Sequence, residues 1–189
     1  MTNSPGRRDG VAQDRLPPWA IVSPERRAHV GRVAALITEW STALHLPIAE
    51  TARWLRSAWL HDALRDAPEG EMRRWAPNID GPVELRHGPA AAARAELEGE
   101  SDADVLSAVR WHSVGWNGWG RAGRALYCAD FLEPGRSFDR VERAALASRF
   151  PDDPEAVLRD VVRRRFAYAD TQGWGHPPES LAFRQTVLG

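Results

Sequence analysis

The sequence predicts an all-α protein, a bundle of several helices. Apolar residues recur at intervals of three and four, as in Val30, Val33 and Ile37. Long alternating runs of β-branched residues, which indicate strands, are absent. Capping residues, prolines and glycines stand where the apolar stretches begin and end. A chain of 189 residues fits one domain. We therefore expect a single helical domain over 20–189, behind a flexible lead-in over 1–19 that is rich in proline, glycine and charge.

The first helix begins at Ser23-Pro24-Glu25, which supplies an N-cap, a proline at the first helical position and an acid in the first turn. Leu46-Pro47 interrupts the pattern, and a second helix is predicted from about Ile48 to Arg65. A loop over 68–82 contains one helical turn at 71–75. Further helices are predicted over 89–97, 102–112, 121–132, 139–149, 154–170 and 179–188, with a glycine- and tryptophan-rich loop over 115–120.

The composition excludes several classes of protein. The chain has 25 basic and 26 acidic residues, so bulk charge argues against a nucleic-acid-binding protein. Every basic residue is an arginine, which excludes a phosphate-binding P-loop lysine and a Schiff-base lysine. The one cysteine, Cys128, excludes an intrachain disulfide and a cysteine-rich zinc site. We interpret Cys128 as a small buried apolar residue.

No stretch reaches the roughly 18 apolar residues that a membrane span needs. The first twenty residues lack the apolar segment of a secretory signal. The sequence therefore predicts a cytoplasmic protein with no membrane or nucleic-acid partner.

Histidine and aspartate residues recur at intervals of about one helix plus one connection. In a bundle, such residues can converge on one interior site. Their side chains suit Fe, Mn, Co or Zn, and the set is large enough for two ions if an aspartate or a hydroxide bridges them. The residues are His29, His61, Asp62, His87, His112 and Asp130.

The same residues resemble a known family. His29, the doublet His61-Asp62 and Asp130 follow the pattern of the HD-domain metal-dependent phosphohydrolase superfamily. His87-Gly88-Pro89 and the segment Ala129-Asp130-Phe131-Leu132-Glu133-Pro134-Gly135-Arg136 are similar to the YqeK-like branch, the bacterial symmetrical diadenosine tetraphosphate hydrolases. The similarity covers about residues 25–150, and it implies an HD-type helical bundle.

The resemblance implies that all six residues are ligands of a dinuclear divalent-metal site, with iron as the usual metal. It implies cleavage of diadenosine tetraphosphate into two ADP by a metal-bound hydroxide. Asp62, Arg65 and His112 are then the candidate catalytic residues. Arg65 stands where the family has a lysine, and Ser113 where it has a threonine. Arg65, Ser113 and Arg136 are the candidate phosphate-binding residues, and Trp116 is a candidate platform for a nucleobase.

Two alternatives stay open at this point. The chain could be another HD-domain nucleotidase or phosphodiesterase, since Arg65 and the tryptophan loop differ from the family pattern. It could also be a non-catalytic nucleotide-sensing module, because a fold does not fix a function. The sequence does not decide between a monomer and a homodimer, between one metal and two, or among Fe, Mn, Co and Zn. It assigns no role to residues 151–189.

Overall fold

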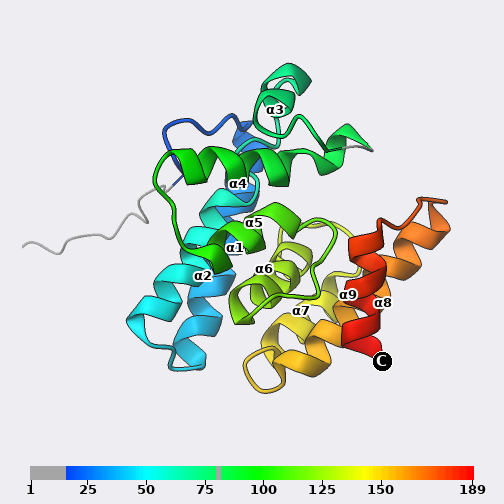
Figure 1. Cartoon of the computed structure of the whole chain (residues 1–189). Helices are drawn as coiled ribbons and strands as arrows, with labels where there is room; N and C mark the ends of the chain where they lie inside the picture. Colours follow the sequence, from blue (N-terminus) through cyan, green and yellow to red (C-terminus); the bar gives the residue numbers. More distant parts are fainter. Residues whose placement is uncertain (1–15, 80–81) are drawn as a thin grey trace, which may run out of the picture.

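The computed structural model describes residues 16–79 and 82–189, and these residues form helices without strands (Figure 1). The all-α expectation is confirmed. The predicted lead-in falls largely on residues 1–15, which lie outside the described residues. The elements are α1 (Pro24–Ala43), α2 (Ile48–Leu60), α3 (Glu69–Trp75), the 3-10 turn η1 (Val83–Leu85), α4 (His87–Leu97), α5 (Ala103–Trp111), α6 (Arg121–Leu132), α7 (Arg140–Arg149), α8 (Pro154–Thr171) and α9 (Pro178–Leu188).

Local signals explain where these helices start. The hydroxyl of Ser23 accepts a hydrogen bond from the backbone N–H of Arg26, which caps α1. The carboxylate of Asp102 accepts from the backbone N–H groups of Asp104 and Val105 and caps α5. Asp153 caps α8 in the same way. These three caps therefore fix where α1, α5 and α8 begin.

The second helix is shorter than predicted. It ends at Leu60, whereas apolar spacing predicted a helix to Arg65. Beyond His61 the backbone forms tighter hydrogen bonds, from the N–H of Ala63 to the carbonyl of Leu60 and from the N–H of Arg65 to the carbonyl of Asp62. Periodicity alone does not distinguish such a series of turns from one more turn of α-helix.

Helix α6 lies in the middle of the bundle and packs against α1, α2, α5, α7 and α8. It is buried along nearly its whole length, and Ala125, Leu126 and Ala129 are fully inaccessible. Cys128 is also fully buried, as expected of a small apolar residue. This central position carries Asp130 into the interior.

A second, smaller core lies under α3 and α4. Helix α4 is rich in alanine, and Ala90, Ala91 and Ala92 are all inaccessible. Small side chains let α4 approach α5 and α3 closely. Close approach brings the first residue of α4, His87, to the end of α5.

Helices α8 and α9 pack beside α6 at the C-terminal side of the bundle (Figure 1). Phe183 of α9 is buried against Trp119 and Tyr127. The hydroxyl of Ser180 donates to the carbonyl of Val114. The C-terminal helices thus hold the loop that follows α5.

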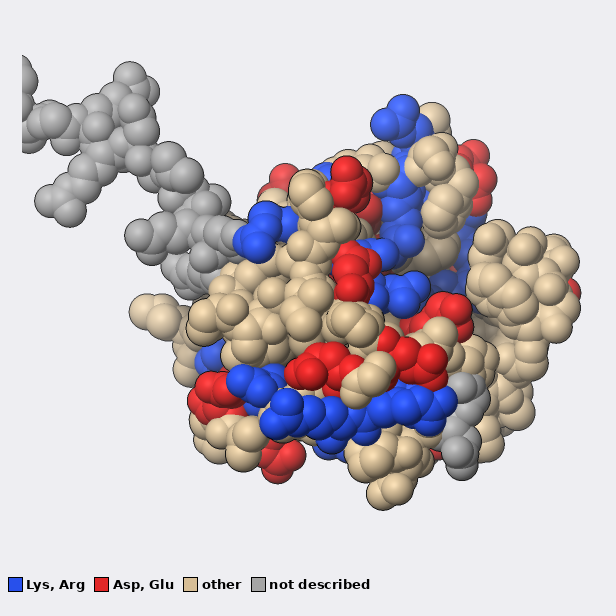
Figure 2. Space-filling model, turned by 90° about the horizontal axis from the view of Figure 1, so that it is seen from above, with Lys and Arg blue, Asp and Glu red and all other residues tan. Residues whose placement is uncertain are grey.

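Arginine and carboxylate side chains are mixed on the face seen from above in Figure 2. Bands of both signs lie side by side there, and both signs also meet in a hollow near the centre of the face. This face therefore carries no broad patch of a single charge. None of the helices in the described residues is long and apolar enough to cross a bilayer.

Candidate metal centre

All six residues expected to bind metal are buried and come together in the bundle. They lie at the start of α1, just after α2, at the start of α4, just after α5 and near the end of α6. In each of two groups the ligand atoms lie within 4.8 Å of one another. One group is His29, His61 and Asp130, and the other is Asp62, His87 and His112.

Asp62 lies between the two groups and faces both. Its Oδ1 lies 3.0 Å from Nε2 of His87 and 3.4 Å from Nε2 of His112. Its Oδ2 lies 3.5 Å from Nε2 of His61 and 3.6 Å from Nε2 of His29. A carboxylate in this position can bridge two cations, one on each oxygen.

Each histidine is oriented through its Nδ1 atom. In His61, His87 and His112, Nδ1 lies 2.7, 2.6 and 2.8 Å from a backbone carbonyl oxygen. Carbonyl oxygens only accept, so Nδ1 carries the proton in these three rings. Their Nε2 atoms are left as lone-pair donors that face the centre, the orientation of metal-binding histidines.

The donor set fits divalent cations. Nε2 of His87 lies 2.9 Å from Nε2 of His112, and Nε2 of His61 lies 3.4 Å from Nε2 of His29. With Nδ1 protonated in His87 and His112, two lone pairs face each other inside the protein without a proton to share. A cation between them removes that repulsion, and His with Asp suits borderline divalent metals. The fold and these buried groups indicate a divalent-metal site.

Charge in the centre favours a cation as well. Burial disfavours an ionised Asp62, but the surrounding histidines outweigh burial and hold the pKa of Asp62 well below its usual range. Burial also opposes a charge on His29, yet hydrogen bonds to Asp130 and Glu133 raise its pKa to about 9. Burial lowers the pKa of His61 to about 4. The site therefore combines two ionised carboxylates, Asp62 and Asp130, with a neutral His61 and a His29 that keeps its proton until a cation replaces it.

Arginines surround these carboxylates. Arg26 donates from Nη1 to Oδ2 of Asp62 at 2.8 Å. Arg136, expected to bind phosphate, donates from Nη2 to Oδ1 of Asp130 at 2.6 Å. Arg65 is half-buried. Burial lowers the pKa of His87, and the charge of Arg65 adds to this effect. None of the contacts in the described part of the chain occupies the Arg65 guanidinium, which leaves its five N–H groups for another acceptor.

The two remaining candidate residues lie in the loop after α5. The hydroxyl of Ser113 lies 3.1 Å from Nε2 of His112 and 3.5 Å from Nε2 of His87, at the edge of the centre. Trp116 stacks on Trp111, with ring centroids 5.2 Å apart and planes 12° from parallel. One face of the Trp116 indole is therefore already covered by the protein.

Three further residues touch the centre and were missed. Arg26 lies one turn before His29, and Glu133 lies one turn after Asp130, so helical spacing could have found both. Arg165 donates to the carbonyl of Ser113 at 3.0 Å and lies 3.4 Å from Oδ2 of Asp130. A run of three arginines at 163–165 is by itself typical of a solvated helix face, which fits the exposed Arg163. Arg165 differs, because α8 turns it toward α6.

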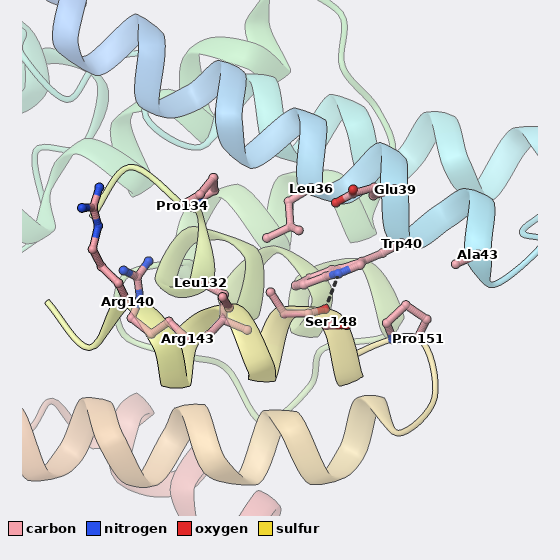
Figure 3. Close-up of a pocket in the computed structure, with 12 residues that line it drawn as sticks. Leu36, Glu39, Trp40, Ala43, Leu132, Pro134, Arg140, Arg143, Ser148 and Pro151 are labelled. Atoms are coloured by element: carbon pink, nitrogen blue, oxygen red, sulfur yellow. Dashed lines mark hydrogen bonds between the residues drawn. The ribbon is translucent and has the colours of Figure 1, made fainter. Parts of the chain in front are cut away.

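A separate cavity of about 440 Å³ lies between α1 and α7 (Figure 3). Leu36, Trp40 and Leu132 line it, and Trp40 donates its indole N–H to the carbonyl of Ala147. None of the six candidate ligands lines this cavity. It is distinct from the metal centre.

Comparison with known proteins agrees with this arrangement. No protein-family model matches the chain. Among curated proteins, it is similar to the "Bis(5'-nucleosyl)-tetraphosphatase, symmetrical" of Bacillus subtilis, with 33% identity over 94 residues, or 46% of this chain and 50% of that protein. It is similar to the protein of the same name from Staphylococcus aureus, with 37% identity over 60 residues, 31% of each chain. The matched segments thus span half or less of these relatives.

Similarity in three dimensions extends over nearly the whole chain. A crystal structure from Clostridium acetobutylicum, described as a predicted HD superfamily hydrolase involved in NAD metabolism, superposes with a TM-score of 0.75. The match covers 88% of this chain and 90% of that one, at 18% identity. The chain has the HD-domain fold, and part of its sequence is similar to the symmetrical tetraphosphatases. The resemblance inferred from the HD doublet and from residues 129–136 is confirmed.

Proposed function

We propose that this YqeK-like chain is a divalent-metal-dependent phosphohydrolase that cleaves diadenosine tetraphosphate symmetrically into two ADP. The observation that carries the proposal is the position of Asp62. Its Oδ1 faces His87 and its Oδ2 faces His61, so one carboxylate links two ligand groups. The names of the curated relatives support the choice of substrate.

The six buried residues would hold two divalent ions, one on each side of Asp62. Ions held there make water nucleophilic near neutral pH and offset negative charge on phosphate oxygens. Iron is the metal that the family resemblance favours, and Mn, Co and Zn also suit a His/Asp donor set. Hydrolysis joins the water oxygen to one inner phosphorus and breaks the central P–O–P bond, which releases two ADP.

Arginines would hold the phosphate chain. Arg65 is the strongest candidate, because its guanidinium is not engaged by the described residues and its charge acts on His87. Arg136 already binds Asp130, and Arg26 already binds Asp62. Each can share its remaining N–H groups with a phosphate oxygen. Their charges would stabilise negative charge that moves to the leaving oxygen.

Residues of the loop after α5 would complete the site. Asp62 and His112 belong to the catalytic centre, and the Ser113 hydroxyl beside His112 can bond a phosphate oxygen. The face of the Trp116 indole that Trp111 does not cover would stack on an adenine. Trp111 behind it keeps this platform rigid.

A product assay tests the proposal. The protein is incubated with diadenosine tetraphosphate and Fe(II) without oxygen, or with Mn(II) or Co(II), and the nucleotides are separated by ion exchange. We expect ADP as the only product, and none from Asp62→Ala. ATP together with AMP would contradict the symmetrical cut. No turnover with any metal would contradict diadenosine tetraphosphate as the substrate and favour another phosphate ester or a nucleotide-sensing module.

The role of Trp116 has its own test. Stacking of a base on an aromatic ring is worth about 1–3 kcal/mol. Trp116→Ala should therefore raise the KM for the dinucleotide by roughly 5- to 150-fold and leave kcat nearly unchanged. Trp174→Ala, which removes an exposed tryptophan between α8 and α9, is the control. Equal KM values for parent and Trp116→Ala would remove Trp116 from the site.

Three statements about the whole chain stay predictions of the sequence. They are the single domain over 20–189, the cytoplasmic location and the absence of nucleic-acid and membrane partners. The oligomeric state, monomer or homodimer, is likewise a matter for solution measurement.

A further inference from the structure

Glu133 ends helix α6 and turns a buried carboxylate toward His29. Its Oε1 lies 3.2 Å from Nδ1 of His29. Its Oε2 accepts hydrogen bonds from Nε of Arg32 at 2.5 Å and from the backbone N–H of Gly135 at 2.6 Å. The side chain is 1% exposed. Glu133 thus contacts His29 at Nδ1, whereas Nε2 of the same ring lies near Asp130 and Asp62.

This contact distinguishes His29 from the other three histidines. Their Nδ1 atoms face backbone carbonyls, whereas that of His29 faces a carboxylate. A carboxylate partner fixes the ring orientation and makes the opposite nitrogen a stronger donor to a metal. The histidines of the centre are therefore unequal.

The chain around Glu133 is built to hold it in place. A Cβ atom on Gly135 would lie 2.2 Å from Nε of Arg32, so any larger residue at this position would displace the Arg32 guanidinium from its present place beside Glu133. Behind the segment, the buried Arg143 donates to the backbone carbonyls of Phe131, Glu133 and Arg136. The position of the carboxylate is thus fixed from both sides.

The two ligand groups also differ in charge. The group of His29 and His61 includes Asp130 and faces Oδ2 of Asp62, so two carboxylates serve it. The group of His87 and His112 has Asp62 alone. More anionic ligands bind a divalent cation more tightly. Arg26 and Arg136 offset part of this negative charge, but the number of carboxylate ligands and the orientation of His29 favour the same group.

We propose that Glu133 is a positioning residue that orients His29 and makes the His29/His61/Asp130 group the tighter of two metal positions. The inference rests on the metal centre of the proposed function and assigns the two positions different affinities. The tight position would fill first and stay filled. The His87/His112 position, with fewer protein ligands, would be the one that exchanges.

Titration of the metal-free protein with Co(II), followed by calorimetry and visible absorption, tests the inference. The parent should bind two equivalents in two steps. Glu133→Ala should weaken one step by about 10- to 100-fold. Glu133→Gln, which keeps an acceptor without the charge, should show a smaller loss. Glu155→Gln removes a carboxylate that pairs with Arg124 at the surface and should change neither step.

Two double variants show which of the two metal positions the affected binding step belongs to. In a His87→Ala background the His29/His61/Asp130 position remains. Adding Glu133→Ala should weaken metal binding at that position. In an Asp130→Ala background the His87/His112 position remains, and Glu133→Ala should leave it unchanged. Equal affinities of the two steps in the parent would overturn the inference. So would a Glu133→Ala protein that titrates like the parent, or one that loses both steps equally.

Failure of this inference can be separated from failure of the proposed function. A parent that binds two Co(II) in unequal steps but hydrolyses no diadenosine tetraphosphate contradicts the proposed function only. A parent that releases ADP, with a Glu133→Ala variant whose metal titration is unchanged, contradicts the role of Glu133 only.

Discussion

Gly88 lets His112 come within reach of His87. A Cβ atom on Gly88 would lie 2.9 Å from the backbone carbonyl oxygens of Val109 and Arg110 and 3.2 Å from Cε1 of His112. The first turn of α4 therefore packs directly on the last turn of α5. This close approach places the two Nε2 atoms 2.9 Å apart, on one side of Asp62.

Gly88→Ala should push α4 away from α5. The added methyl meets backbone atoms, which cannot rotate aside, so we expect a loss of about 1–3 kcal/mol in the free energy of unfolding. The His87/His112 position should lose metal affinity as well. Urea unfolding and Co(II) titration measure the two effects. Gly31→Ala is the matched control, because that helical glycine has open space and alanine there should stabilise by about 0.5–1 kcal/mol. Similar effects of both substitutions would contradict this account of Gly88.

Sequence reasoning could find the candidate ligands because each carries a distinctive side chain at or near a helix end. The His61-Asp62 doublet and His87 needed only residue type and spacing. Arg165 lies 35 residues from Asp130, and no local rule links them; α8 turns this arginine inward while Arg163 stays solvent-exposed. The apolar pattern also could not predict that α2 ends at Leu60, because the tighter turns that follow keep a similar apolar spacing.

Asp102 should stabilise α5 in a pH-dependent way. Burial opposes its ionisation, but hydrogen bonds from Arg53 and from the backbone N–H groups of α5 outweigh burial and lower its pKa. The contribution of Asp102 to the free energy of unfolding is therefore complete above its unfolded-state pKa, near pH 4. This contribution is lost as the pH falls through the lower folded-state pKa. Asp102→Ala should cost about 1 kcal/mol at neutral pH, and Asp102→Asn, which can still cap, less. Urea unfolding at pH 7 and pH 3 measures the loss of unfolding free energy in each variant. A loss in Asp102→Ala that is larger at pH 3 than at pH 7 would contradict this role of the ionised carboxylate.

Divalent metal should stabilise the fold. A ligand that binds only the folded state adds about 2.7 kcal/mol per site at 100 times its Kd. For a chain of this size, we expect Mn(II) or Co(II) to raise the Tm by about 5–10 °C relative to protein treated with chelator. Calorimetry measures the shift. Asp62→Ala, which removes the shared carboxylate, should lose most of it; a full shift in that variant would show that the ions bind elsewhere.

Cys128 should be protected from thiol reagents in the folded protein. Its side chain is fully buried in α6, and burial raises the pKa of the thiol. An aromatic disulfide reagent should release no chromophore from the native chain and one equivalent after denaturation. Rapid reaction of the native protein would mean that α6 is accessible, contrary to its central position.

The two-ion centre across Asp62 is tested most directly by anomalous diffraction from crystals grown with Mn(II). The account predicts two peaks on opposite sides of the Asp62 carboxylate. One should lie among His29, His61 and Asp130, and the other between His87 and His112. A single peak, or peaks away from Asp62, would contradict a centre in which this carboxylate joins two metal positions.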